Sequence, residues 1–96
     1  MAVFELFIRG ENFRRKEGEV IKLMGFYTTR WTEALNESEA ETVVINAMRQ
    51  TPELQKPDWH DGSGPNAKVY VEEIEEVISG WDGKPGIGFI WFEEGT

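Results

Sequence analysis

The only histidine of the chain, His60, stands between carboxylates in the segment Asp58-Trp59-His60-Asp61. An imidazole beside a carboxylate can transfer protons near neutral pH or bind a metal ion. The chain has no second histidine and no cysteine, so this segment would make a poor transition-metal site. We therefore predict no metal and no cofactor, and a solvated loop is the simpler interpretation. The alternative is a small ligand-binding protein or enzyme that uses the loop of residues 57–66 and the Glu72–Glu76 segment, with candidate ligand-binding residues Trp59, His60, Asp61 and Arg30.

Four glutamates lie close together in the stretch from residue 72 to residue 76. Two carboxylates on one strand face could bind a divalent cation or act as an acid–base pair. Alternation along a strand predicts Glu72 and Glu76 on one face and Glu73 and Glu75 on the other. A charged strand that resists edge-to-edge aggregation is the simpler interpretation. No catalytic residue is assigned, and the sequence favours a non-enzymatic protein without deciding the question.

Basic and aromatic side chains are interleaved in the first third of the chain. Residues 1–30 hold six Lys or Arg against four acids, although the whole chain has a net charge of −8. Basic and aromatic groups on a sheet can stack the bases of a single-stranded nucleic acid. An acidic protein repels phosphate backbones, so nucleic-acid binding is only a second alternative. The residues concerned are Arg9, Arg14, Arg15, Lys16, Lys22, Arg30, Phe7, Phe13 and Phe26.

Two long strands are predicted to hold these groups in place. Residues 2–13 alternate with period two, and Gly10-Glu11-Asn12 predicts a bulge near the end of this strand. A charged hairpin loop is predicted from Arg14 to Gly18. Residues 19–34 are rich in β-branched and aromatic residues, and Gly25 predicts a bend or a close backbone approach.

A single helix is predicted to follow these strands. Asn36 and Glu39 have capping-box spacing, and Pro52 marks the end of the helix. Its apolar stripe contains Ala40, Val43, Val44, Ala47 and Met48. A long loop is predicted over residues 51–67, followed by strands over residues 67–79 and 87–93.

This order of elements predicts one α+β domain spanning residues 1–96, with a four-stranded antiparallel sheet in the order β-β-α-β-β. One helix covers only one face of such a sheet. Four tryptophans and six phenylalanines are more than this helix can hide, so some should lie on the second face. We therefore predict an interaction or assembly module that forms a homodimer, or binds a small protein partner, through this face. The predicted interface residues are Phe7, Phe26, Trp31 and Trp91.

The composition also bears on the cellular compartment. The chain has no cysteine and no apolar run of the roughly 18 residues that a membrane span needs. Its first ten residues lack the basic start and cleavage site of a signal peptide. The sequence therefore predicts a cytoplasmic protein without a membrane partner.

Two segments carry a family resemblance: GFYTTRW at residues 25–31, followed by Glu33-Ala34 and the capped helix, and PGIGF at residues 85–89. They resemble a family of small uncharacterised bacterial proteins with no established activity, so the resemblance implies no catalytic residues. The strand, the Glu-Ala pair and the Ser-x-Ala-Glu helix start are also similar to HicB-type antitoxin domains, which have a β-β-α-β partial RNase H-like core and bind a small toxin. The glycine-rich strand and the acidic segment after the helix depart from that pattern. This second resemblance therefore implies architecture and not function.

Overall fold

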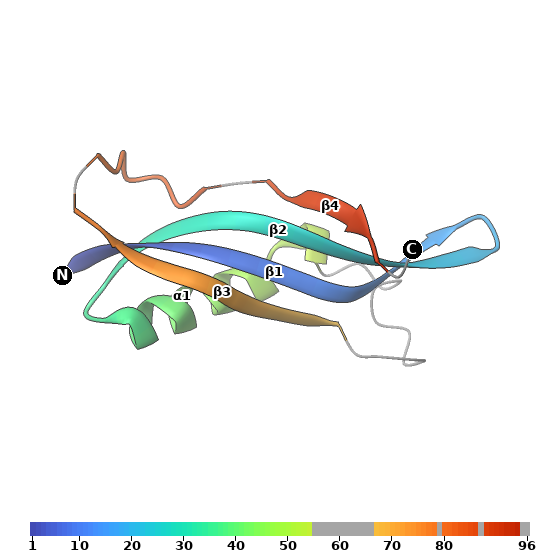
Figure 1. Cartoon of the computed structure of the whole chain (residues 1–96), viewed down its shortest axis with the longest axis horizontal. Helices are drawn as coiled ribbons and strands as arrows, with labels where there is room; N and C mark the ends of the chain where they lie inside the picture. The colour runs from blue at the N-terminus through green and yellow to red at the C-terminus, as the bar shows by residue number, and fades with distance from the viewer. Residues whose placement is uncertain (55–66, 79, 87, 95–96) are drawn as a thin grey trace.

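The computed structural model describes residues 1–54, 67–78, 80–86 and 88–94. Strands β1 (Ala2–Glu17), β2 (Val20–Ala34), β3 (Lys68–Val77) and β4 (Ile90–Glu93) form one antiparallel sheet in the order β3-β1-β2-β4. Helix α1 (Glu37–Arg49) follows β2, and a short 3-10 turn, η1 (Pro52–Leu54), follows the helix. The molecule is elongated, with extents of 48 × 20 × 20 Å, and α1 lies across one face of the sheet (Figure 1). The predicted α+β class and element order are confirmed.

The β1–β2 hairpin is longer than predicted. The predicted loop from Arg14 to Gly18 is wrong, because β1 continues to Glu17 and only Gly18 and Glu19 form the turn. Gly18 has φ of 62°, the left-handed conformation that tight two-residue hairpin turns require. The bulge predicted at residues 10–12 is confirmed, since the register shifts between Gly10 and Phe13 and Asn12 has φ of 62°.

Helix α1 begins where the sequence predicts. Asn36 is the N-cap, and its Oδ1 accepts a hydrogen bond from Glu39 N at 2.9 Å. The Glu39 side chain in turn accepts a hydrogen bond from Leu35 N at 3.4 Å, which satisfies a second backbone donor at the helix start. The buried residues of the helix are Ala40, Val44 and Met48. These three side chains hold the helix against the sheet, and we call this side of the sheet the covered face.

The core lies between α1 and the covered face. Leu6, Ile8 and Phe26 are fully buried there. The Phe26 ring lies directly over Gly10, where an added Cβ would come within 2.0 Å of Cε2 of the ring. Phe26 also contacts the rings of Phe13, Phe89 and Trp91, at centroid distances of 5.4, 4.9 and 5.1 Å. An aromatic cluster therefore closes the end of the core beyond the helix.

The edge strand β3 contains a second register shift. Phe7 pairs with Glu73 and Ile8 pairs with Val71, which leaves Glu72 without a partner in the ladder. The predicted grouping of Glu72 with Glu76 on one face is wrong, because this extra residue breaks the period-two alternation. Glu76 lies opposite Phe4 on the covered face, whereas the Glu72 carboxylate lies 3.9 Å from Nη1 of Arg9.

The last strand is shorter than the predicted residues 87–93, because β4 contains only Ile90–Glu93. The chain reaches it by running back along the outer edge of β2 (Figure 1). Along this edge Trp31 N donates to Pro85 O at 2.9 Å and the Thr28 hydroxyl donates to Gly88 O at 2.7 Å. Gly86 and Gly88 have φ of 92° and 90°, which is incompatible with a regular strand.

Candidate functional site

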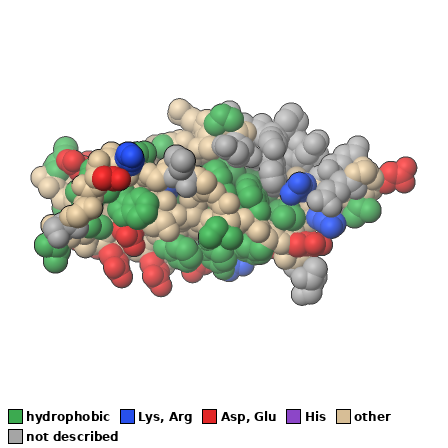
Figure 2. Space-filling view, turned by 90° about the horizontal axis from the view of Figure 1, so that it is seen from above, with side chains coloured by type: hydrophobic (Ala, Val, Ile, Leu, Met, Phe, Trp, Pro, Cys, Tyr) green, Lys and Arg blue, Asp and Glu red, His purple; other side chains and the backbone are tan. Residues whose placement is uncertain are grey.

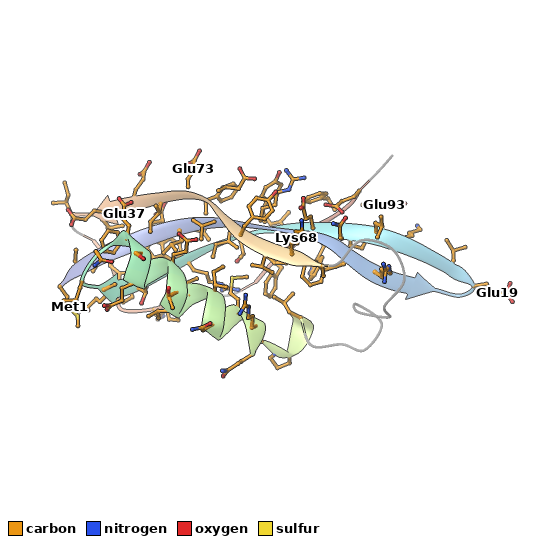
Figure 3. The ribbon with its side chains drawn as sticks, turned by 90° about the horizontal axis from the view of Figure 1, so that it is seen from below. Met1, Glu19, Glu37, Lys68, Glu73 and Glu93 are labelled. Atoms are coloured by element: carbon orange, nitrogen blue, oxygen red, sulfur yellow. The ribbon has the colours of Figure 1, made fainter. Side chains whose placement is uncertain are left out.

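The sheet face opposite α1 is covered by no element among the described residues, and we call it the uncovered face. Figure 3 shows the helix on one side of the sheet and the Glu73 side chain on the other. Phe7 of β1, Tyr27 of β2 and Phe92 of β4 lie on this face and form a stack across three strands. The Phe7–Tyr27 and Tyr27–Phe92 centroid distances are both 5.2 Å, with interplanar angles of 6° and 29°. We call these three rings the aromatic row.

Arg9 lies on top of the aromatic row. Its Cζ atom is 5.7 Å from the centroid of Tyr27 and 5.8 Å from that of Phe92, both within the range of cation–π contacts. Glu72 approaches the same guanidinium, at 3.9 Å from Nη1. Arg9 Nε is buried and has no hydrogen-bond partner among the described residues. The guanidinium is thus held mainly by aromatic faces and by one distant carboxylate.

Gly25 explains how Phe92 can lie flat on the sheet. An added Cβ at Gly25 would come within 2.5 Å of Cζ of Phe92, so the ring occupies the space that a side chain would need. Phe92 pairs with Gly25 across the β2–β4 ladder. The close backbone approach predicted at Gly25 is therefore present, and it seats one end of the aromatic row.

The face has an apolar centre and an acidic side. Phe7 is 37% exposed and Ile90 is 73% exposed. A groove of about 420 Å³ runs beside the aromatic row between β2 and the segment leading to β4, lined by Tyr27, Thr29, Trp31 and Ile90 among others. Glu73 and Glu75 on β3 are exposed and lie opposite Phe7 and Glu5 of β1. Hydrophobic and acidic side chains lie next to one another along the lower side of Figure 2.

Two hydrogen bonds fix polar groups around the aromatic row. Trp31 Nε1 donates to Glu5 Oε2 at 3.0 Å, and the Tyr70 hydroxyl donates to Glu11 Oε2 at 3.4 Å. Desolvation raises the pKa of the Tyr70 hydroxyl above its usual value of 10.0. The positive charge of Arg9 opposes this rise, and the carboxylate of Glu11 adds to it. Tyr70 is therefore a hydrogen-bond donor throughout the physiological pH range.

A second hollow of about 320 Å³ lies on the covered side, between α1, β2 and the described residues Pro85, Gly86, Gly88 and Phe89. Its apolar wall includes Val44 and Met48 of the helix. Arg30 lines the same hollow, although it is only 8% exposed. Its Nη2 atom donates to Gly88 O at 3.3 Å, and its Cζ atom lies 5.1 Å from the centroid of the Phe89 ring.

The residues predicted for the interface and for the ligand site lie in different parts of the structure. Phe7 and Trp31 lie on the uncovered face as an interface requires, and Trp31 at the edge of β2 also borders the covered-side hollow described above. Phe26 and Trp91 do not, because they pair with each other across β2 and β4 and belong to the aromatic cluster of the core. Their assignment to the interface is corrected on that ground. Trp59, His60 and Asp61 fall outside the described residues, and Arg30 lies on the covered side.

The basic and aromatic residues predicted to bind nucleic acid do not share one surface. Phe13, Phe26 and Arg30 lie in or beside the core, and Arg14 is only 6% exposed. On the uncovered face Arg9 lies beside the exposed glutamates of β3. No continuous basic strip therefore forms from the described members of this set.

Within the described residues, no group of three or more His, Cys, Asp or Glu side chains is arranged to hold a metal ion. No helix in this part of the chain is long and apolar enough to cross a membrane. Comparison with known proteins gives no match to a family model, to a curated protein or to a solved structure. The two resemblances drawn from the sequence therefore stay predictions.

The predicted interface omitted Tyr27 and Phe92, and Arg9 was predicted only for the nucleic-acid alternative. A signal for Tyr27 was present, because it shares its strand parity with Trp31. Parity groups the residues of one strand but does not say which group faces the helix. Which group faces the helix depends on the register between the strands, and the bulges in β1 and β3 both shift this register.

Proposed function

We propose that this protein is a non-enzymatic, cytoplasmic interaction module that forms a homodimer through the uncovered face. The observation that carries the proposal is the aromatic row with exposed Phe7 and Ile90, on a face that no described element covers. Aromatic side chains are enriched in the centres of protein interfaces. They contribute large contact areas there and lose little conformational freedom on binding.

The size of the face suits a dimer. The outline of the whole molecule, 48 by 20 Å, sets an upper limit of about 960 Å² for this face, which leaves room for the ~800 Å² that each partner contributes to a standard interface. In an isologous dimer the same patch is used by both subunits. The aromatic row would then form the centre of the interface, and the glutamates of β3 would lie at its rim, where water solvates them.

Charge makes a second prediction about this dimer. Two copies that each carry a net charge of −8 repel one another, and salt screens this repulsion over about 10 Å at 0.1 M. Because the attraction between the faces is apolar, added salt should tighten the dimer. A partner held by ion pairs would instead be released by salt.

Sedimentation analysis or size-exclusion chromatography with light scattering, at micromolar concentration and at two salt concentrations, tests the proposal. Wild type should dimerise, with a lower Kd at the higher salt concentration. Phe7→Ser and Ile90→Ser should each raise the Kd at least about tenfold, which is the effect of losing about 1.4 kcal/mol. Leu35→Ser is the matched control, because Leu35 is 71% exposed but lies just before the helix, outside the aromatic row.

A monomeric wild-type protein under all these conditions would refute the homodimer. Equal effects of Phe7→Ser and Leu35→Ser would instead locate the interface elsewhere. Of the alternatives, a ligand site at residues 57–66 with the Glu72–Glu76 segment would have to bind through groups outside the described residues. Single-stranded nucleic-acid binding would have to give a salt-sensitive affinity, which the exposed glutamates beside Arg9 oppose.

A further inference from the structure

The hollow between α1, β2 and the described residues Pro85, Gly86, Gly88 and Phe89 lies on the covered side, and its helix wall takes no part in the proposed homodimer. Its volume of about 320 Å³ is at the lower end of the range for small-molecule sites. Taking about 30 Å³ for each water-sized group, the hollow holds roughly ten non-hydrogen atoms. This size suits a small organic molecule and is too small to enclose more than a side chain or two of a protein segment.

The walls of the hollow have two chemical characters. One wall is apolar and comes mainly from one side of the helix, with Val43, Val44, Ala47 and Met48, faced by Phe89. The other contains Arg30, which is more than nine-tenths buried and carries its positive charge at every physiological pH. Thr32 and Thr51 also line the hollow. A cation on the wall of a largely apolar hollow attracts an anion more strongly than the same cation in water.

Arg30 is held in a fixed position beside the hollow. Its guanidinium packs on the Phe89 ring at 5.1 Å, and its Nη2 atom donates to Gly88 O at 3.3 Å. The backbone that forms this wall depends on glycine, since Gly86 and Gly88 both have positive φ. An added Cβ at Gly86 would also lie 2.7 Å from Thr29 O. A guanidinium held in this way loses little freedom when it binds a carboxylate.

We propose that this hollow binds a small monocarboxylate with an apolar body, its carboxylate at Arg30 and its apolar part against Val44 and Met48. The planar guanidinium matches a carboxylate in geometry and charge. A neutral molecule of the same shape would gain only the apolar contact. A cationic one would be repelled by Arg30.

Octanoate, which has about ten non-hydrogen atoms, is a suitable probe, with octanol and octylamine as neutral and cationic counterparts. Titrations followed by ¹H–¹⁵N NMR should shift the amides of Val44, Met48 and Gly86, which line the hollow but not the groove beside the aromatic row. Octanoate should bind at least about tenfold more tightly than octanol, the discrimination expected from one charge-assisted pair. Octylamine should give no saturable shift.

Two variants test the two walls separately. Arg30→Met keeps an apolar side chain of similar length, and it should abolish the preference for octanoate over octanol. Ala47→Phe fills the hollow from the exposed side of the helix, and it should abolish binding of both. Asn46→Phe is its matched control, because Asn46 is exposed on the same helix but does not line this hollow. If Arg30→Met does not fold, Ala47→Phe against Asn46→Phe still decides the location.

The proposal is overturned if octanoate and octanol bind equally, if neither shifts the named resonances at millimolar concentration, or if Ala47→Phe binds octanoate like wild type. Phe7 lines only the groove and Ala47 lines only the hollow, so Phe7→Ser should leave octanoate binding unchanged and Ala47→Phe should leave the dimer unchanged. Loss of dimerisation with intact octanoate binding would therefore remove only the proposed function. The reverse result would remove only the ligand site.

Discussion

The two faces of the sheet contain the same contact, a phenylalanine ring laid over a glycine, in opposite surroundings. On the covered face Phe26 lies over Gly10, and the ring is fully buried. On the uncovered face Phe92 lies over Gly25 and keeps part of its surface exposed. The first ring is fixed by neighbours on every side, whereas the second is held by stacking on Tyr27 and by the strand below it.

This difference shows what the helix contributes. Identical local chemistry gives a closed core where α1 and the aromatic cluster complete the packing, and an open patch where no described element does. An aromatic patch left open to water is a candidate binding surface, whereas an aromatic cluster inside a core contributes to the stability of the fold. The comparison therefore predicts that substitutions on the covered face change stability and that those on the uncovered face change association.

The largest effect is expected from truncating the two rings. Phe26→Ala should lower the free energy of unfolding by about 3–5 kcal/mol, because the packed core cannot collapse into the cavity that the removed ring leaves. Phe92→Ala should lower it by about 1–2 kcal/mol, since water fills the vacated space and mainly the stacking contact is lost. Urea denaturation of the two variants measures both values. Equal losses would mean that the two faces are packed alike.

The glycines give the next largest difference. Gly10→Ala should destabilise by about 1–3 kcal/mol, because the new Cβ must displace a ring that has no free space. Gly25→Ala drives Phe92 outward into solvent, and the loss should be about 1 kcal/mol or less. Each glycine-to-alanine change also lowers the conformational entropy of the unfolded chain, which stabilises both variants by a similar amount. This stabilisation cancels when the two variants are compared. Thermal unfolding monitored by circular dichroism ranks the two variants, and the reverse order would contradict the assignment of faces.

Much of this arrangement was predictable from local sequence signals. Asn36 and Glu39 mark the helix start by their spacing, and the Gly10-Glu11-Asn12 run marks a bulge. The extent of the hairpin was not predictable in this way. Residues 14–17 are charged and look like a loop, yet they continue the ladder because Gly18 supplies the turn. Tertiary pairing thus overrides composition at the hairpin tip.

The candidate site was less predictable than the fold, for a physical reason. A strand exposes alternate residues to each face, so a shift of one position exchanges the two groups. Phe26 and Tyr27 are adjacent and equally aromatic, and only the pairing with β1 and β4 decides which is buried. The pairing of Arg30 with Phe89 depends on the backbone at Gly88, which has no sequence signal beyond the glycine itself.

The helix cap tests whether the covered face depends on α1. Asn36→Ala removes the acceptor for Glu39 N and should destabilise the protein by about 1 kcal/mol. Asn46→Ala is the matched control, because Asn46 is exposed in the middle of the helix and alanine favours a helix. Hydrogen exchange should show faster opening of α1 amides in Asn36→Ala only. Dimerisation through the uncovered face should be unchanged in both, and a weakened dimer would show that the faces are coupled.

The smallest expected effect concerns the pH dependence at Tyr70 on the uncovered face. Desolvation raises the pKa of its hydroxyl in the folded protein above 10.0. Between the unfolded and folded pKa values the native chain therefore holds a proton that the unfolded chain has lost. The free energy of unfolding must fall with pH in that window, and the stabilising contribution is fully present only below about pH 10.

Tyr70→Phe has no such proton, so the stability difference between wild type and Tyr70→Phe should shift against wild type as the pH rises from 9 to about 11. Urea denaturation at a series of pH values measures this difference, and the lysines cancel because both proteins share them. A difference that stays constant across the range would mean that the hydroxyl is as well solvated in the fold as in the unfolded chain, and that this side of the uncovered face is fully open to water.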